Sequence, residues 1–459
     1  MKNIFSFLII CLSLGIALSS CEITPDLNIS PNDPEDVSVN LLLPSAQLGT
    51  FFTYGDDNAR VTSMWMQQHS GTDRQYIPIA RYSYTEADVN ASWQRAYADA
   101  MMDLNRLIEK AEAEESYHYS GIAKINMAMV LGVVTDLWND VPYSDGFKGI
   151  EGVVKPTYDN QEAIYTTIQS LLDQGIVDLT KESVNSVSSN DIIYGGDLDK
   201  WTACANVLKA RYALHLSKVN GNAAYEAALA ALDAGAFAGT ADNAEGKFAL
   251  STPNENFWFS FTVVQRPGYI SAGKYLVDLL LDSGDPRIAT YFNADDADGG
   301  YSGSAPGEAE ELKSTTGPAF GSQDSPIPLV TYEEQKFIEA EAAFETGDTE
   351  RAATAYNEGV AASIASYGSS DSTYLADNAN ETAGSISLEK IMNQKYIALF
   401  TQIEVYNDWR RTGFPVLSIA TNAALTEIPR RLVYPQSERL YNQENTPFAT
   451  ATDRVWWDN

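Results

Sequence analysis

Residues 332–367 read YEEQKFIEAEAAFETGDTERAATAYNEGVAASIASY, a stretch with a regular helical pattern. Its apolar residues recur every three or four positions, which predicts two helices over 332–346 and 349–367. Small residues at fixed positions would let the two helices run antiparallel at close range, as in a tetratricopeptide repeat. The residues that carry this spacing are Ala340, Ala343, Ala352, Tyr356 and Gly359.

The same helical periodicity extends through most of the chain, and residues 212–231 repeat the tetratricopeptide spacing loosely. We therefore predict a mainly all-α fold in which tetratricopeptide-like hairpins stack as a solenoid-like scaffold. An irregular helical bundle is the alternative. Further helices are expected over 41–54, 91–115, 121–138, 160–179, 199–219, 223–234 and 387–402.

Two segments interrupt this pattern, residues 64–84 and the loop-rich residues 237–328. Long irregular segments in a compact protein are usually functional. Both combine aromatic rings with amide or guanidinium groups, the mixture that a sugar-binding site requires. We predict that residues 65–84 and 257–269 within these segments form a ligand face, although each ring could equally be ordinary core. The expected ligand-binding residues are Trp65, Gln68, Tyr76, Tyr82, Trp258, Arg266 and Tyr269.

The N-terminus has the pattern of an export signal over residues 1–20: Lys2, then a short apolar run, then small residues. Leu18-Ser19-Ser20-Cys21 resembles the lipobox of bacterial lipoproteins, which makes Cys21 the expected lipidated residue. An ordinary secretory signal is the alternative. Residues 21–40 are polar and proline-containing, which predicts a flexible acylated tether, and residues 41–459 are expected to form a single domain. No later run is expected to span a membrane.

The formal net charge of −32 argues against nucleic-acid binding, because phosphate recognition needs clustered cations. Once Cys11 leaves with the signal and Cys21 carries lipid, Cys204 stands alone, so no intrachain disulfide is expected. A buried, inert thiol is expected there.

No metal or catalytic site is predicted. The three histidines, His69, His118 and His215, have no metal-ligand spacing. Asp295, Asp296 and Asp298 hint at calcium, but they lack a full binding loop, and a solvated acidic turn is preferred. No nucleophile, phosphate-loop or dinucleotide motif is found, so neither an enzyme activity nor a cofactor is predicted.

Four motifs resemble those of one known family. Residues 404–415 (EVYNDWRRTGFP), 428–435 (IPRRLVYP) and 134–143 (VTDLWNDVPY) resemble the late, closing and second-helix signatures of the SusD/RagB family. Residues 28–34 after the lipobox also fit. The motifs occur in the family's order over essentially the whole mature chain.

The resemblance implies an outer-membrane lipoprotein of Bacteroidota-type bacteria, displayed on the cell surface. Such proteins form a lid over a SusC-like, TonB-dependent transporter barrel. They bind a nutrient, most often an oligosaccharide, pass it to the barrel, and are not enzymes. The cluster of Asp408, Trp409, Arg410 and Arg411 is expected to be scaffold, because arginines can clamp carboxylates and helix-end carbonyls.

Three other functions remain open from the sequence. A surface glycoside hydrolase needs only a pair of acids, and 62 Asp and Glu residues cannot exclude it. A repeat scaffold that recruits proteins would need no aromatic ligand face. A family member with peptide cargo would agree with the acidic charge, which suits basic peptides.

Overall fold

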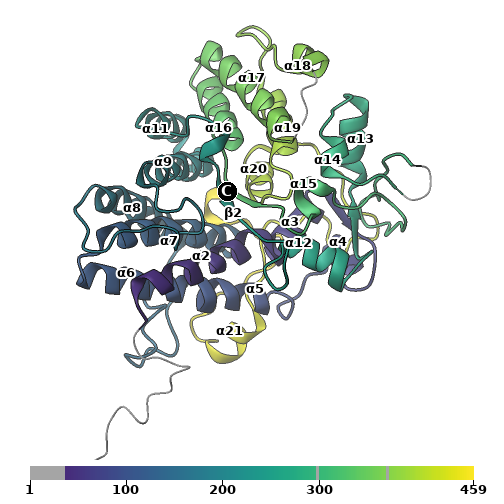
Figure 1. Ribbon diagram of the computed structural model, residues 1–459. Helices are drawn as coiled ribbons and strands as arrows, with labels where there is room; N and C mark the ends of the chain where they lie inside the picture. Colours follow the sequence, from purple (N-terminus) through teal and green to yellow (C-terminus); the bar gives the residue numbers. More distant parts are fainter. Residues whose placement is uncertain (1–36, 296–298, 368–371) are drawn as a thin grey trace, which may run out of the picture.

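The computed structural model describes residues 37–295, 299–367 and 372–459, and it is mainly helical, as predicted (Figure 1). The expected signal peptide, Cys21 and residues 21–36 of the expected tether lie outside the described residues. So do Asp296 and Asp298 of the acidic turn.

The stretch 332–367 forms the predicted hairpin, α16 (Tyr332–Glu345) and α17 (Thr349–Ser366). Each helix begins at a side chain that accepts a hydrogen bond from a free backbone N–H: Thr331 for α16 and Asp348 for α17. The small residues lie between the helices, with Ala340, Ala343 and Ala352 fully buried. The expected tetratricopeptide-like packing is therefore confirmed.

Further helices stack beside this hairpin along one side of the molecule (Figure 1). Asn160 and Asp197 cap α8 and α9. The helices of this side are α6 (Met102–Ala113), α7 (Tyr117–Trp138), α8 (Gln161–Leu179), α9 (Leu198–His215), α10 (Ser217–Asn220) and α11 (Asn222–Asp233).

α7 is long and apolar enough to cross a membrane, contrary to the expectation that no later segment would be. Its apolar stretch is wholly buried inside the protein, however, as is usual for the central helix of a helical core. Its burial explains the length of the apolar run.

Most of the described part of the loop-rich residues 237–328 lies on the opposite side of the molecule, where α12 to α15 are found, and β2 lies near the centre (Figure 1). These residues contain short elements and part of two small antiparallel sheets, β1–β3 and β2–β4. The elements of this side are β1 (His69–Gly71), α4 (Tyr76–Ala80), η3 (Thr240–Asp242), β2 (Ala244–Gly246), α12 (Phe257–Phe259), η4 (Ser260–Gln265), β3 (Ile270–Ala272), α13 (Lys274–Asp282), α14 (Ile288–Tyr291), α15 (Pro318–Gly321) and β4 (Ile327–Val330).

The N-terminal helices differ from the expectation in two places. Residues 57–65 are helical, so the irregular segment begins later than residue 64. The helix expected over 91–115 contains a π-helical insertion, η2. The elements are α2 (Val39–Gly55), α3 (Asp57–Trp65), α5 (Asn90–Gln94) and η2 (Arg95–Met101).

The C-terminal segment ties the scaffold together through buried ion pairs. Arg411 binds Glu341 of α16 at 2.6 Å and Asp408 at 2.7 Å, which confirms the scaffold role expected for this cluster. Lys395 pairs with Asp408 at 2.8 Å. The remaining elements are α18 (Ser372–Asn378), α19 (Leu388–Ala398), α20 (Glu404–Thr412), α21 (Gln436–Tyr441) and η5 (Trp456–Asp458).

Candidate ligand-binding site

A cavity of about 530 Å³ lies where α2, α3 and η2 meet the loop-rich side. This volume is within the usual range for small-ligand sites. Its wall includes Phe52 from α2, Arg60 from α3, Arg95 from η2, Phe257 from α12 and Phe261 from η4. Segments more than 200 residues apart in sequence therefore build it together.

Aromatic rings form the apolar part of the wall. Phe52 and Phe257 stack face to face, with centroids 4.2 Å apart and planes at 9°. Phe248 meets Phe257 edge to face at 5.0 Å, and Tyr76 contacts Phe261 at 5.1 Å. The rings supply apolar surface to the wall, although the facing sides of Phe52 and Phe257 cover each other and Arg95 lies over Phe52.

Charged groups are held rigidly beside these rings. Arg60 forms an ion pair with Asp56 at 2.5 Å, and its guanidinium lies 4.4 Å from the Phe261 centroid. Arg95 also pairs with Asp56, and it lies 4.8 Å from the Phe52 centroid. The arginines are thus fixed both by a carboxylate and by a ring face.

Tyr76 links the charged groups to the predicted ligand face. Its hydroxyl accepts a hydrogen bond from Arg60 Nε at 3.2 Å and donates one to Asp57 at 3.1 Å. Burial raises the pKa of Tyr76, an effect that Arg60 only partly opposes. The phenol therefore stays protonated and remains a donor.

Three side chains of the cavity wall hold polar atoms that have no hydrogen-bond partner among the described residues: Arg60 Nη1, Ser92 Oγ and Glu255 Oε2. Leaving a buried polar atom unpaired costs about 1–3 kcal/mol. Nine further atoms of this kind lie elsewhere in the described residues, so these three mark the polar part of the cavity wall and do not by themselves identify a ligand.

Two rare backbone features position the wall. Both η2 and η4 are π-helical, and such segments often occur at functional sites. Gly49 lets α2 approach η2 closely, because a Cβ there would lie 2.4 Å from the Asp99 carbonyl oxygen. This contact places Phe52 beside Arg95.

The structure brings the two predicted ligand segments together. β1 pairs with β3 in antiparallel register, with His69 opposite Ala272, and the Thr72 N–H donates to the Tyr269 carbonyl at 2.9 Å. Of the seven predicted residues, Tyr76 lines the cavity. Arg266 and Tyr269 lie close by on the same loop, Arg266 exposed and 5.9 Å from the Tyr269 ring.

The other four predicted residues are buried, and none of them lines this cavity. Trp65 Nε1 donates to the Ile79 carbonyl at 3.2 Å, and the Gln68 amide donates to the Tyr396 carbonyl at 3.0 Å. The Tyr82 hydroxyl accepts from the Ala420 N–H at 2.9 Å. Trp258 is 2% exposed and packs against His69. In this conformation all four stabilise the fold beneath the surface of the loop-rich side.

Sequence analysis missed Phe52 and Arg95 because they fall in expected helices. It missed Asp56, Asp57 and Arg60 because residues 55–63 were assigned to no element. One signal was present: Asp56, Asp57 and Arg60 interrupt an otherwise apolar N-terminal region. Charges that lie against a core usually have a specific partner.

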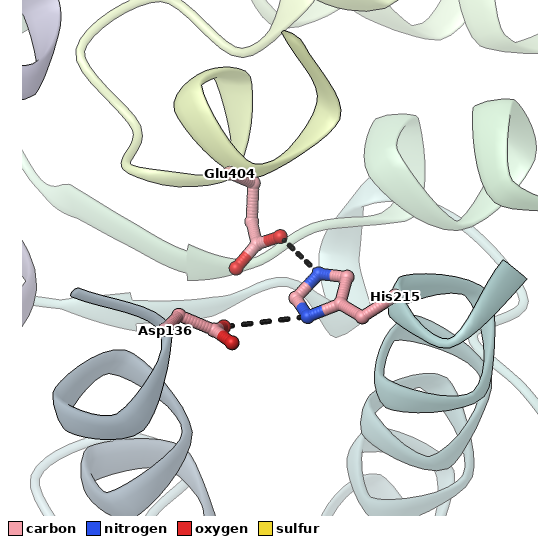
Figure 2. Close-up of side chains that lie close together, drawn as sticks. All are labelled: Asp136, His215 and Glu404. Carbon is pink, nitrogen blue, oxygen red and sulfur yellow. Dashed lines mark hydrogen bonds and ion pairs between the residues drawn. The ribbon is translucent and has the colours of Figure 1, made fainter. Parts of the chain in front are cut away.

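A second cluster, Asp136, His215 and Glu404, joins three elements in the protein interior (Figure 2). His215 Nε2 lies 2.8 Å from Glu404, and Nδ1 lies 3.3 Å from Asp136. Burial alone would lower the pKa of His215, but the two carboxylates raise it to about 9. The raised pKa favours the protonated imidazole, which can donate one hydrogen bond towards each carboxylate.

The rest of this cluster is also occupied by protein partners. Trp457 Nε1 donates to Asp136 at 2.9 Å, and the Asn407 amide donates to both Asp136 and Glu404 at 3.1 Å. The arrangement is a buried ion-pair network that ties α7, α9 and α20 together.

The fold and the cavity together define a class: an all-α protein with a tetratricopeptide-like scaffold and a ligand-sized cavity on its loop-rich side. A SusD-like family model, described as "Starch-binding associating with outer membrane", matches residues 31–435. The chain belongs to the SusD-like family.

Solved structures agree with this assignment. A chitin-binding protein is 26% identical, with 92% of this chain and 100% of that chain covered and a TM-score of 0.78. A chitin-binding SusD homolog from Flavobacterium johnsoniae is 22% identical over 91% and 98% of the two chains, also with a TM-score of 0.78. A SusD/RagB family protein from Bacteroides thetaiotaomicron is 24% identical over 92% and 99%, with a TM-score of 0.76. A search among curated proteins found no match.

Proposed function

We propose that this protein captures an oligosaccharide at the cell surface and delivers it to a SusC-like, TonB-dependent outer-membrane transporter. The observation that carries the proposal is the cavity: stacked rings beside buried polar atoms that the protein leaves unpaired. This combination matches the apolar faces and hydroxyl edges of a sugar.

The relatives support a carbohydrate as the ligand. Two similar structures are described as chitin-binding, which makes β-linked N-acetylglucosamine oligomers the first ligands to test. An acetamido group supplies one N–H donor and one carbonyl acceptor. The cavity wall offers complements to both, the carboxylate of Glu255 and the guanidinium of Arg60.

The attachment to the outer membrane is proposed from the sequence. Cys21 carries the lipid, and the family description places such proteins in association with the outer membrane. The acyl chains would hold the domain at the cell surface, because two or more chains give stable anchoring.

Isothermal titration calorimetry with chitotriose, cellotriose and maltotriose tests capture. We expect saturable binding of at least one of them and a loss of that binding in Arg60→Ala, whose folding is checked by circular dichroism. Binding that survives Arg60→Ala would place the site outside this cavity.

A reducing-end assay on the same mixtures separates a binder from a hydrolase. We expect no new reducing ends, because two of the three carboxylates in the cavity wall, Asp56 and Asp57, are already paired with arginines. Release of reducing ends would favour the glycoside hydrolase alternative.

Co-purification from the native membrane in mild detergent tests delivery. A barrel-sized partner of the TonB-dependent class should be recovered with the protein. Recovery of the free protein alone, at native expression level, would argue against the partnership.

A further inference from the structure

The charges around the cavity are not balanced. The wall includes three carboxylates, Asp56, Asp57 and Glu255, and two guanidinium groups, Arg60 and Arg95. Asp56 pairs with both arginines, and Asp57 lies 3.5 Å from Arg60. The positive charges are therefore already neutralised by the protein.

Glu255 is the exception. Its Oε2 is shielded from solvent and has no hydrogen-bond partner, and no ion pair to Glu255 is found in the described part of the chain. A carboxylate without a cationic partner leaves a net negative charge at the cavity wall. In a partly buried setting that charge is screened less than it would be at an open surface.

We propose that Glu255 is a specificity-determining residue, through which the cavity selects neutral or amine-bearing sugars and rejects acidic ones such as uronic acids and sulfated sugars. The inference rests on the proposed function, because it assigns the ligand class of the same cavity. Membership of the SusD-like family does not by itself say whether neutral or acidic sugars are preferred.

The physical reason lies in the two possible partners of Glu255. A sugar hydroxyl, an acetamido N–H or an ammonium group donates a charge-assisted hydrogen bond to the carboxylate. A sugar carboxylate or sulfate has no proton to donate at neutral pH, so it would meet Glu255 as a like charge. Specificity of this kind comes from the penalty against the wrong ligand as much as from contacts to the right one.

The arginines do not reverse this preference. Arg60 and Arg95 are each held by Asp56, so an acidic sugar would have to compete with that carboxylate for either guanidinium. The Arg60–Asp56 pair is buried, and breaking it would leave a buried charge unpaired, which is strongly unfavourable, whereas the Arg95 side chain is 41% exposed. A neutral carbonyl or hydroxyl oxygen can accept from Arg60 without displacing Asp56.

A charge series of trisaccharides tests the inference by calorimetry: a glucosamine trimer in mildly acidic buffer, neutral chitotriose, and trigalacturonate. For the wild-type protein we expect chitotriose to bind at least tenfold more tightly than trigalacturonate, and the glucosamine trimer to bind no more weakly than chitotriose. Glu255→Gln keeps the size and one acceptor oxygen but removes the charge. It should reduce the chitotriose-to-trigalacturonate preference by about fivefold or more, the scale of one like-charge contact.

Glu151→Gln is the matched control, because it removes the same charge from an exposed loop and does not line the cavity. The chitotriose-to-trigalacturonate preference of Glu151→Gln should equal that of the wild type. An equal change in Glu151→Gln and Glu255→Gln would be an effect of net charge and would overturn the inference. Two further results would overturn it: wild-type protein that prefers trigalacturonate, and an unchanged preference in Glu255→Gln. Either result would leave the proposed oligosaccharide capture intact, whereas failure of all three sugars to bind would count against both.

Discussion

The stacked rings Phe52 and Phe257 are the residues on which sugar binding should depend most. They lie parallel at 4.2 Å and are only partly buried, so they present apolar area that a ligand can cover. Hydrogen bonds to a sugar largely exchange water for protein partners, whereas ring burial removes apolar surface from water.

Phe257→Ala should therefore weaken oligosaccharide binding by about 1–3 kcal/mol, the scale of burying a large apolar side chain. Calorimetry with the best-binding trisaccharide measures the change. Phe448→Ala is the control: this ring is 79% exposed and does not line the cavity, so the affinity and stability of this variant should match those of the wild type.

Trp258→Ala should differ from both variants and lose about 3–5 kcal/mol of stability, because the Trp258 ring lies in the core. Wild-type affinity in Phe257→Ala would remove the cavity as the binding site.

His215 should give the protein a stability limit at alkaline pH. Its pKa is raised from an ordinary value near 6.5 to about 9 by Glu404 and Asp136, despite the opposing effect of burial. Arg211 lies 3.9 Å from Glu404, and the Tyr165 hydroxyl lies 2.9 Å from His215 Nδ1. Since the folded state binds the proton more tightly, this stabilisation is complete below about pH 6.5 and is lost as pH rises through 9.

Urea unfolding between pH 6 and pH 9.5 measures this loss, which we expect to be on the order of 2–3 kcal/mol. His118→Gln, a partly buried histidine outside the network, should keep the same pH dependence. In His215→Gln, the free energy of unfolding should no longer fall between pH 6.5 and pH 9.5, and its maximum value should be lower than that of the wild type. A wild-type free energy of unfolding that stays constant from pH 6.5 to pH 9 would show that the network carries no proton-linked stability.

At the scale of elements, the cavity depends on how closely α2 and η2 approach. Gly49 faces the backbone of η2, and a methyl group would meet the Asp99 carbonyl oxygen at 2.4 Å and the Ala100 Cα at 2.7 Å. Both neighbours are backbone atoms, which cannot rotate away as a side chain can. The two elements would have to separate, and Phe52 and Arg95 would move apart with them.

Gly49→Ala should accordingly destabilise the protein by about 1–3 kcal/mol, the usual cost of overpacking, although alanine is the better helix former. It should also weaken sugar binding, because the wall of the cavity shifts. Gly149→Ala provides the comparison, since no atom of the described residues lies within 4 Å of the added methyl group. Urea midpoints of the two variants give the test, and equal midpoints would rule out the tight contact.

At the scale of the whole molecule, the scaffold is held by buried polar pairs as well as by apolar packing. Arg211 pairs with Glu334 at 2.5 Å, Arg287 with Asp285 at 2.5 Å and Arg411 with Glu341 at 2.6 Å. The first and third of these pairs join α16 to other elements. Such pairs require one geometry, so they favour a single arrangement of the hairpins.

Membrane attachment should reside in Cys21 and not in the folded domain. α7 is the candidate span in the described residues, and it is enclosed by the core. Cys21→Ala should leave a folded protein that no longer sediments with membranes, with the same melting temperature as the wild-type domain. The experiment is run in cells that lack the transporter partner, because the partner could retain the protein by itself. Sedimentation of the variant under those conditions would refute the single-anchor proposal.

Much of the fold could be predicted from local sequence. The hairpin over 332–367 and the helices that begin at capping residues such as Asn160 and Asp197 depend on contacts a few residues apart. Periodicity and capping are local properties, so one sequence displays them directly. The same holds for the prediction that residues 237–328 would interrupt the helices.

The prediction that residues 65–84 and 257–269 act together also came from local sequence, since both segments break the helical pattern and carry the same mixture of side chains, and the pairing of β1 with β3 does bring them together. Which rings line the cavity depends on the tertiary packing. Trp65 and Trp258 turn inward and Phe52 and Phe257 outward, although all four are large apolar residues. The choice depends on the neighbours that each ring meets across the fold, such as the Ile79 carbonyl for Trp65. These long-range contacts cannot be predicted from the spacing of residues along the chain. The same is true of the close approach of α2 and η2 at Gly49 and of the unpaired charge of Glu255, because both arise only when the elements pack.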